Sequence, residues 1–214
     1  MKTFRVLCLL FVVLLAGSLA AAEFSGDVTG VSTYVWRGVK QFNGVAMQGT
    51  ASLTTGPVTV GLWTSTMGGP VEVETDPFVE IGLPTGDLST AIGATLYSYD
   101  FFAESEYNVY EMYGGLGYGP VGVTLFYTPE QENMDESVYW LEFSGGTALL
   151  GADVSATLGY GTYSSSTDGA VTTLLLSAGK SITDNIAVSW NYSIGLSDDD
   201  NLENIFFLAS SYSF

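Results

Sequence analysis

Histidine is absent from the whole chain of 214 residues, and cysteine occurs only once, at Cys8. Without histidine, the Ser–His–Asp and Cys–His arrangements of nucleophilic catalysis cannot form, and the commonest protein metal ligand is missing. A single cysteine has no partner for a disulfide within the chain, which excludes a disulfide framework. The sequence therefore predicts a protein that is not an enzyme and that has no metal site and no cofactor.

Basic residues are scarce. Beyond Lys2 and Arg5 at the N-terminus, only Arg37, Lys40 and Lys180 stand against 23 acidic side chains. So acidic a chain repels phosphate backbones and anionic headgroups. We expect no nucleic-acid partner and no basic patch that would hold the protein on a membrane surface.

Long hydrophobic runs are also missing. Beyond residue 22 no apolar run reaches the roughly 18 residues that a transmembrane helix needs. The N-terminus has two basic residues, a short apolar run from Val6 to Ala16 and small residues at Ala20 and Ala22. This pattern is typical of a secretory signal peptide. We expect residues 1–22 to be a cleaved signal and residues 23–214 to form one exported domain.

The apolar residues of that domain are dispersed with a period of two, as in half-buried strands. In Asn185–Gly195, for example, Ile186, Val188 and Trp190 alternate with small or polar residues. About twelve such segments follow one another: Phe24–Lys40, Gly44–Thr54, Val58–Thr66, Pro77–Leu83, Leu88–Tyr99, Tyr107–Tyr118, Val121–Thr128, Ser137–Ser144, Ala152–Tyr163, Ala170–Ile182, Ile186–Gly195 and Asn204–Phe214. The pattern predicts an all-β fold, a transmembrane antiparallel up-and-down β-barrel of about 12 strands.

The connections alternate between short turns and longer acidic stretches. The short ones are Thr55-Gly56-Pro57, Pro84-Thr85-Gly86, Gly119-Pro120 and Thr183-Asp184, and the longer ones are Met67–Asp76, Asp100–Glu106, Pro129–Glu136 and Ser197–Glu203. Short periplasmic turns and long external loops are typical of outer-membrane barrels. We expect the acids of these loops to form a solvated rim. The alternative is that divalent ions bridge them to lipopolysaccharide. The loop acids are Glu72, Glu74, Asp76, Asp100, Glu104, Glu106, Glu130, Glu132, Asp135, Glu136, Asp168, Asp198, Asp199, Asp200 and Glu203.

Charged residues within the strand segments must face away from lipid, because Arg or Lys on the lipid face costs about 2–4 kcal/mol at the bilayer midplane. We therefore expect six residues to face the lumen: Arg37, Glu80, Glu111, Glu142, Asp27 and Asp153. Arg37, on the first strand, would stand among the three glutamates. Two interpretations remain open, a charged constriction that selects small cations and an ion-pair network that fills the interior without conducting.

Aromatic residues cluster near the ends of the segments. We expect them to form girdles at the two membrane interfaces rather than to line a ligand track along the lumen. These residues are Tyr34, Trp36, Tyr97, Tyr99, Tyr127, Trp140, Tyr160, Tyr192 and Tyr212.

The last segment alternates up to the end of the chain, through Phe206, Leu208, Ser210, Tyr212 and Phe214. An amphipathic last strand with a terminal aromatic residue is what the outer-membrane assembly machinery recognises. We expect Tyr212 and Phe214 to form this assembly signal, which makes the barrel assembly machinery an expected partner.

The segment Ser32–Gln41, with the sequence STYVWRGVKQ, resembles the TorF-type porins, a proteobacterial family with an S-x-Y-[VF]-[FW]-R-G-[IV]-[ST]-Q motif in its first strand. The resemblance continues at residues 46–49, 61–65 and 107–114. Lys40 departs from the motif, in which a small hydroxyl residue precedes the glutamine. The resemblance implies an outer-membrane barrel with a pore, in a family without an assigned substrate.

These features favour a porin-like channel of the cell outer membrane for passive diffusion of small solutes or ions, with a preference for cations. One alternative is a closed barrel that serves as a structural or adhesion scaffold of the envelope. Another is a soluble, secreted β-sandwich that binds a ligand, which would also show short alternating strands. The other expected partners are outer-membrane lipid, lipopolysaccharide and the solutes.

Overall fold

The computed structural model describes residues 22–68, 72–83, 86–99, 108–131, 134, 136–162 and 170–214. Nearly all of the expected signal peptide lies outside the described residues, and so do six expected loop acids: Asp100, Glu104, Glu106, Glu132, Asp135 and Asp168. The described part of the chain has no helix that is long and apolar enough to cross a membrane.

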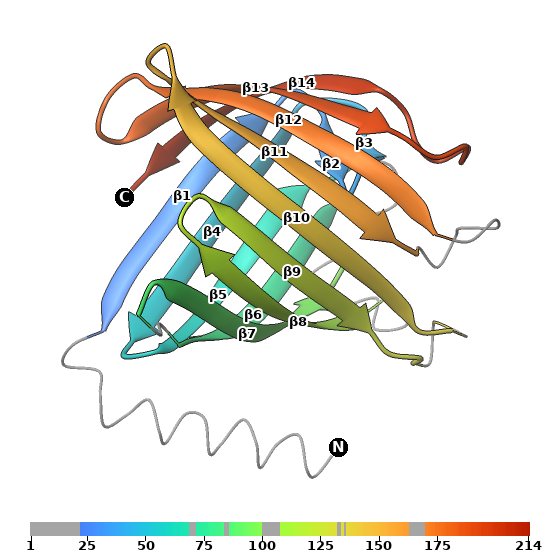
Figure 1. Cartoon of the computed structure of the whole chain (residues 1–214), viewed down its shortest axis with the longest axis horizontal. Coiled ribbons are helices and arrows are strands. Elements are labelled where there is room, and N and C mark those ends of the chain that lie inside the picture. Colours follow the sequence, from blue (N-terminus) through green and yellow to red (C-terminus); the bar gives the residue numbers. More distant parts are fainter. Residues whose placement is uncertain are drawn as a thin grey trace, which may run out of the picture.

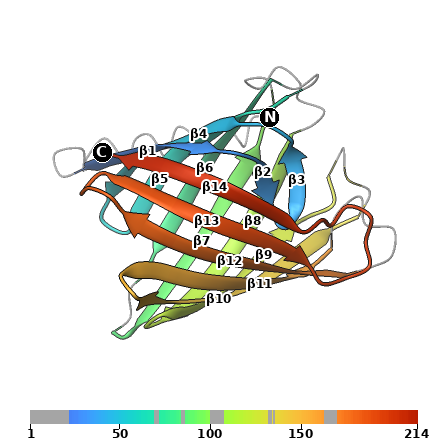
Figure 2. The ribbon, with the colours of Figure 1, turned by 90° about the horizontal axis from the view of Figure 1, so that it is seen from above.

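Twelve strands form one closed antiparallel ring (Figures 1 and 2). The ring strands are β1 (Glu23–Val31), β4 (Ala46–Thr55), β5 (Val58–Thr66), β6 (Val73–Gly82), β7 (Leu88–Tyr97), β8 (Val109–Tyr118), β9 (Val121–Thr128), β10 (Val138–Leu149), β11 (Ala152–Gly161), β12 (Val171–Ser181), β13 (Ile186–Gly195) and β14 (Ile205–Ser213). Pairing of β1 with both β4 and β14 closes the ring. The predicted barrel of about 12 strands is confirmed, and a single ring excludes the β-sandwich, which needs two packed sheets.

The two faces of the ring differ as the period-two pattern predicted. The outward side chains are large, apolar and exposed: Phe24, Val28, Met47, Leu62, Ile92, Met112, Leu116, Leu125, Phe143, Leu158, Leu176, Trp190, Phe206 and Leu208. The intervening side chains point inward, and many buried ones are polar, among them Ser65, Glu111, Thr128, Thr173, Asn191 and Ser193. An apolar exterior around a polar interior is the arrangement of a membrane-spanning barrel.

Short turns join the strands at one end of the barrel, on the left in Figure 1. Gly56, Gly119 and Gly151 have φ angles of +56°, +55° and +77°, which glycine adopts without a steric penalty. The predicted turns at Gly56 and Gly119 are confirmed, and the one at Gly151 had not been foreseen. The longer connections lie at the opposite end, which we call the loop end.

The first and last ring strands meet at the short-turn end and complete the ring. Gly26 N donates to Phe214 O at 3.0 Å, and Phe214 N donates to Gly26 O at 2.9 Å. The Phe214 ring lies directly over Gly26, where a Cβ atom would come within 2.8 Å of it, and 6.1 Å from the Phe24 ring. The terminal aromatic residue therefore packs on the outer face of the seam between the first and last strands.

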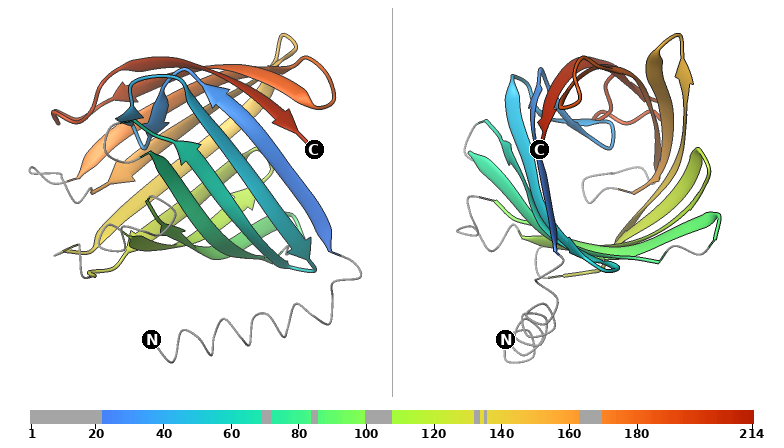
Figure 3. Two further views of the ribbon diagram at one scale, coloured as in Figure 1. Left: turned by 180° about the vertical axis from the view of Figure 1, so that it is seen from behind. Right: turned by 90° about the vertical axis from the view of Figure 1, so that its left-hand side faces the viewer.

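The first ring strand ends at Val31, so the predicted strand Phe24–Lys40 is wrong beyond that residue. The chain turns inward there and forms a separate hairpin, β2 (Tyr34–Trp36) and β3 (Val39–Phe42), before it returns to the ring at β4. The hairpin lies inside the ring, as the right-hand view of Figure 3 shows. We call residues Tyr34–Phe42 the inner hairpin.

The predicted boundary of β6 is also wrong. Its expected start was Pro77, since Met67–Asp76 was expected to be an acidic loop, but β6 begins at Val73 and Pro77 pairs with Leu62 inside the ladder. Glu74 and Asp76 consequently belong to a strand rather than to a solvated loop. Each is only 4% exposed.

Candidate solute pathway inside the barrel

The inner hairpin reaches across the loop end of the lumen. On one side the Tyr34 hydroxyl donates to Glu74 of β6 at 2.9 Å, and on another Arg37 contacts Glu111 of β8. At the hairpin turn, Gly38 packs against Thr173 of β12. Contacts with strands on different sides of the ring fix the hairpin in the interior.

The turn of the hairpin explains the position of Arg37. Arg37 and Gly38 occupy the two central positions between the paired residues Trp36 and Val39, with φ angles of +49° and +85°. Positive φ at both positions is the geometry of a type I′ turn, which matches the twist of a two-residue hairpin. A non-glycine residue seldom adopts this conformation, and such residues concentrate at functional sites. Arg37 therefore stands at the tip of the hairpin, not on a ring strand as predicted.

Arg37 and Glu111 form a two-pronged ion pair, with both N–O distances at 2.8 Å. Their side chains are 7% and 3% exposed. The hydroxyls of Tyr97 and Thr128 also donate to the Glu111 carboxylate, at 2.8 Å and 3.1 Å. Glu111 thus accepts four hydrogen bonds, which offset the cost of burying its charge.

Aromatic rings surround the Arg37 guanidinium. Its carbon lies 4.4 Å from the ring centroid of Trp36, 4.5 Å from that of Phe126 and 5.6 Å from that of Trp140. A guanidinium within about 6 Å of an aromatic face is attracted by the ring quadrupole. This end of the lumen therefore holds a cation between one carboxylate and several rings.

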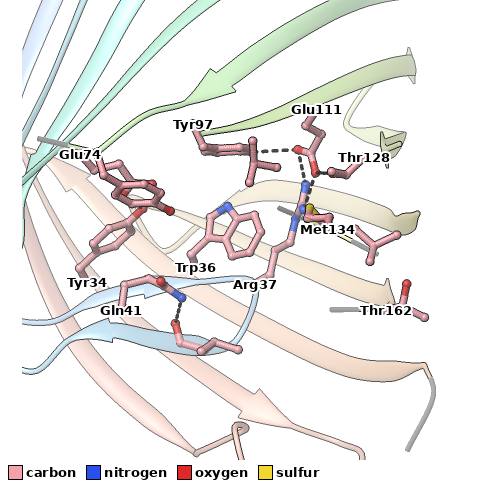
Figure 4. Close-up of a pocket in the computed structure, with 14 residues that line it drawn as sticks. Tyr34, Trp36, Arg37, Gln41, Glu74, Tyr97, Glu111, Thr128, Met134 and Thr162 are labelled. Atoms are coloured by element: carbon pink, nitrogen blue, oxygen red, sulfur yellow. Dashed lines mark hydrogen bonds and ion pairs between the residues drawn. The ribbon is translucent and has the colours of Figure 1, made fainter. Parts of the chain in front are cut away.

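A cavity of about 300 Å³ lies beside the inner hairpin. Its walls include Tyr34 and Trp36 from the hairpin, Glu74 and Tyr97 from the ring, and Tyr99 just beyond β7. Figure 4 shows Trp36 between the Tyr34–Glu74 pair on one side and the Arg37–Glu111 pair on the other.

Glu74 and Asp76 lie two residues apart on the inward face of β6. Glu74 accepts the Tyr34 hydroxyl, and Asp76 accepts the backbone N–H of Ser98 at 3.2 Å. Burial and the adjacent Glu74 raise the pKa of the Tyr34 phenol well above its usual value, so this hydroxyl stays protonated and remains a donor. Among the described residues, neither acid forms an ion pair.

The other expected lumen residues are distributed along the barrel. Glu142 accepts Trp140 Nε1 at 2.9 Å and shares a small cavity with Arg37. Glu80 accepts the Tyr113 hydroxyl at 2.8 Å and lines a separate cavity. Asp153 lines another with Thr29, whose hydroxyl donates to Asp27 at 3.2 Å. The structure therefore groups Arg37 with Glu111 and Glu142, and it places Glu80 in a different cavity.

The expectation for the aromatic residues was right for only part of the set. Tyr127, Tyr160, Tyr192 and Tyr212 are exposed on the outer face, as interfacial girdles require. The other five are wrong as girdle residues, because they lie inside: Tyr34, Trp36, Tyr97, Tyr99 and Trp140. Tyr34 and Trp36 belong to the inner hairpin, whereas Tyr97 and Trp140 lie on ring strands with the parity of the inward side chains.

Sequence reasoning missed Glu74, Asp76, Tyr97 and Thr128 as interior functional groups. A signal for the two acids existed, because Glu74, Asp76, Phe78 and Glu80 share one parity and alternate with Val73, Thr75, Val79 and Ile81. It was obscured because Met67–Asp76 was expected to be an acidic loop. The described residues contain no group of three or more Asp, Glu, His or Cys placed to hold a metal ion.

A closed antiparallel barrel with an apolar exterior and an acidic, hydrogen-bonded interior defines a barrel of the outer-membrane porin type. Solved structures agree with this class. The chain is similar to the KdgM porin in complex with disordered oligogalacturonate, with a TM-score of 0.62 and 15% identity over 89% of this chain and 99% of that one. It is also similar to the COG4313 outer membrane channel from Pseudomonas putida F1, with a TM-score of 0.51 and 11% identity over 89% and 94% of the two chains.

At such low identity the likeness establishes the fold. No family model matches the chain, and no curated protein does. The function therefore has to be argued from the interior of the barrel itself.

Proposed function

We propose that this protein is an outer-membrane channel for passive diffusion of small solutes or ions, with a preference for cations. The observation that carries the proposal is the interior of the twelve-strand ring, which is lined by acids and only partly filled by the inner hairpin. An exported chain with an apolar outer belt would reside in the outer membrane, in contact with its lipid and lipopolysaccharide.

A cavity beside the hairpin and two cavities nearer the short turns support conduction. Besides the one of about 300 Å³ next to the hairpin, the cavities beside Glu80 and Asp153 measure about 380 and 260 Å³. Each exceeds the space that a single water molecule needs many times over. A pathway through these spaces would carry small hydrated solutes past the hairpin.

The fixed charges favour cations. Arg37 is neutralised by Glu111, and Lys40 of the inner hairpin is paired with Glu203 at 2.7 Å. The acids that remain on the inward face outnumber the basic residues of the interior. These acids are Glu74, Asp76, Glu80, Glu142, Asp27 and Asp153. Rings of acidic side chains select cations in channels. The oligogalacturonate of the KdgM complex is a polyanion, which this interior would repel.

Planar bilayer recording tests the proposal. Purified protein inserted into a bilayer under a KCl gradient should give steady conductance. The sign of its reversal potential should show that K⁺ permeates more readily than Cl⁻. Anion selectivity would overturn the proposed preference. Silence from protein whose gel mobility still changes on heating, the sign of a folded barrel, would overturn conduction.

The inner hairpin favours one second candidate, a closed barrel that acts as an envelope scaffold. Three anchors hold the hairpin in the lumen, at Tyr34, Arg37 and Lys40. If it is a permanent plug, the intact protein should be silent, and a variant with residues 33–44 replaced by a short glycine linker should conduct. Equal conductance of both forms would argue against a plug.

We also propose that the chain is related to the TorF-type porins. The segment that resembles their motif, Ser32–Gln41, contains most of the inner hairpin, including its turn. Its Arg-Gly pair occupies the positive-φ positions of that turn, which gives the motif a structural reason. Tyr212 and Phe214 at the seam remain the proposed signal for the assembly machinery.

A further inference from the structure

The loop end of the lumen contains two arrangements of acids with aromatic rings. In the first, Glu111 and the rings of Trp36, Phe126 and Trp140 enclose the guanidinium of Arg37. The protein thus supplies its own cation to this arrangement.

The second arrangement lines the same cavity as Arg37, which is paired there with Glu111, and it has no basic residue of its own. Glu74 faces the cavity of about 300 Å³ together with the rings of Tyr34, Trp36, Tyr97 and Tyr99. Asp76 follows on the same face of β6 as a second buried acid. The ion pairs among the described residues join Arg37 to Glu111 and Lys40 to Glu203, and neither reaches this pair of acids.

Burial of two neighbouring carboxylates without a counter-charge is unfavourable, because the lost hydration is not replaced by attraction to a base. The Tyr34 hydroxyl replaces one hydrogen bond to Glu74, and the Ser98 N–H replaces one to Asp76. Neither donor carries a charge. Burial favours the neutral forms of these acids, and a bound cation would stabilise their charged forms.

The walls of the cavity indicate which kind of cation fits. A small metal ion keeps its water shell and gains little from phenol and indole rings, whereas an alkylated ammonium group is stabilised by aromatic faces. Trp36 presents its ring to both arrangements, and its neighbour Tyr97 lies edge-on at 5.7 Å between ring centroids. An acid set among rings is the usual protein site for organic ammonium ions.

We propose that this cavity binds small organic ammonium cations, with the charged group next to Glu74 and among the rings of Tyr34, Trp36 and Tyr97. Entry of the ligand from outside rests on the proposed channel function, and the inference names its solute class. Binding itself can be measured on detergent-purified protein, so it does not depend on conductance.

Choline and 3,3-dimethylbutan-1-ol make a matched pair of probes, because they share a shape and differ in one positive charge. Titration followed by calorimetry or by tryptophan fluorescence should show saturable binding of choline at least about tenfold tighter than that of the neutral alcohol. Equal affinities would overturn the proposal, since the cavity would then recognise only the shape. Absence of saturable choline binding would overturn it as well.

Two glutamate variants locate the site. Glu74→Gln removes the charge next to the rings, and Glu80→Gln removes an equivalent charge in another cavity, where the acid also accepts a tyrosine hydroxyl. Glu74→Gln should weaken choline binding about tenfold or more, and Glu80→Gln should leave it within about twofold. Equal losses would overturn the assignment, because they would show a general effect of lumen charge.

Conductance separates this inference from the proposed function. A channel that conducts K⁺ but does not bind choline would overturn the ammonium site alone. A silent protein that binds choline with the expected loss in Glu74→Gln would support the site and overturn the channel.

Discussion

The Arg37 guanidinium at the tip of the inner hairpin donates two hydrogen bonds of 2.8 Å to the Glu111 carboxylate of β8, and the two residues are 74 positions apart in the sequence. Both side chains are buried, and two hydroxyls from neighbouring strands also donate hydrogen bonds to the Glu111 carboxylate. A pair so enclosed ties the hairpin to the far wall of the lumen. Loss of Arg37 leaves the buried Glu111 carboxylate without the opposite charge that Arg37 supplies.

Arg37→Ala should therefore destabilise the barrel and release the hairpin. Removal of one partner of a buried pair costs about 3–5 kcal/mol. We expect a lower urea midpoint in refolding experiments with lipid vesicles. In bilayers the variant should show a larger conductance and a stronger cation preference, because the Glu111 charge is no longer neutralised. Unchanged stability and conductance would contradict the anchoring role of the pair.

The pair of Lys40 with Glu203 should contribute far less. Its side chains are 27% and 58% exposed, and exposed pairs contribute about 1 kcal/mol or less. Lys40→Ala should shift the urea midpoint only slightly, by an amount that shrinks further at high salt. It is therefore a matched control for Arg37→Ala, since both remove one basic residue of the same hairpin.

Neutralising the lumen acids should reduce cation selectivity. The double variant Glu80→Gln and Glu142→Gln removes two inward charges from different cavities, so the reversal potential in a KCl gradient should move toward zero. Glu130→Gln removes an exposed acid just after β9 and serves as the control, because salt screens such charges within about 8 Å at 0.15 M. A larger shift from the control would place the selectivity at the rim.

Phe214→Ala should impair assembly more than Phe206→Ala. Both rings are exposed on the outer face of the last segment, at 54% and 59%, so the two variants lose similar apolar surface. Only Phe214 covers the seam at Gly26. We expect a smaller heat-modifiable fraction in outer-membrane preparations of Phe214→Ala. Equal fractions for both variants would contradict a special role of the terminal residue.

Much of the ring could be predicted from the sequence, because a barrel wall separates lipid from a polar lumen. Each strand must therefore place apolar side chains on one face and polar ones on the other. Trp190 and Phe206 had to face lipid, and their alternation with small residues is visible without a structure. The strand count and the short turns followed from the same pattern.

The inner hairpin could not be predicted in this way. Tyr34, Val35 and Trp36 continue the strand-like composition of β1, and only the backbone angles at Arg37 and Gly38 show that the chain reverses. Which residues meet inside a ring depends on strand stagger as well as parity. Arg37 therefore meets Glu111 and not Glu80, although both glutamates share the inward face.

The contacts of the inner hairpin have a consequence for the order of folding. The hairpin lies between the first two ring strands, but its ionic partners Glu111 and Glu203 come 74 and 163 positions after Arg37 and Lys40. Contacts so distant in sequence form late, because the intervening loop must first be closed. The Arg37–Glu111 pair can form only after β8 has joined the wall, and the Lys40–Glu203 pair only after Glu203, just before β14, is in place, so the hairpin reaches its final position late in folding.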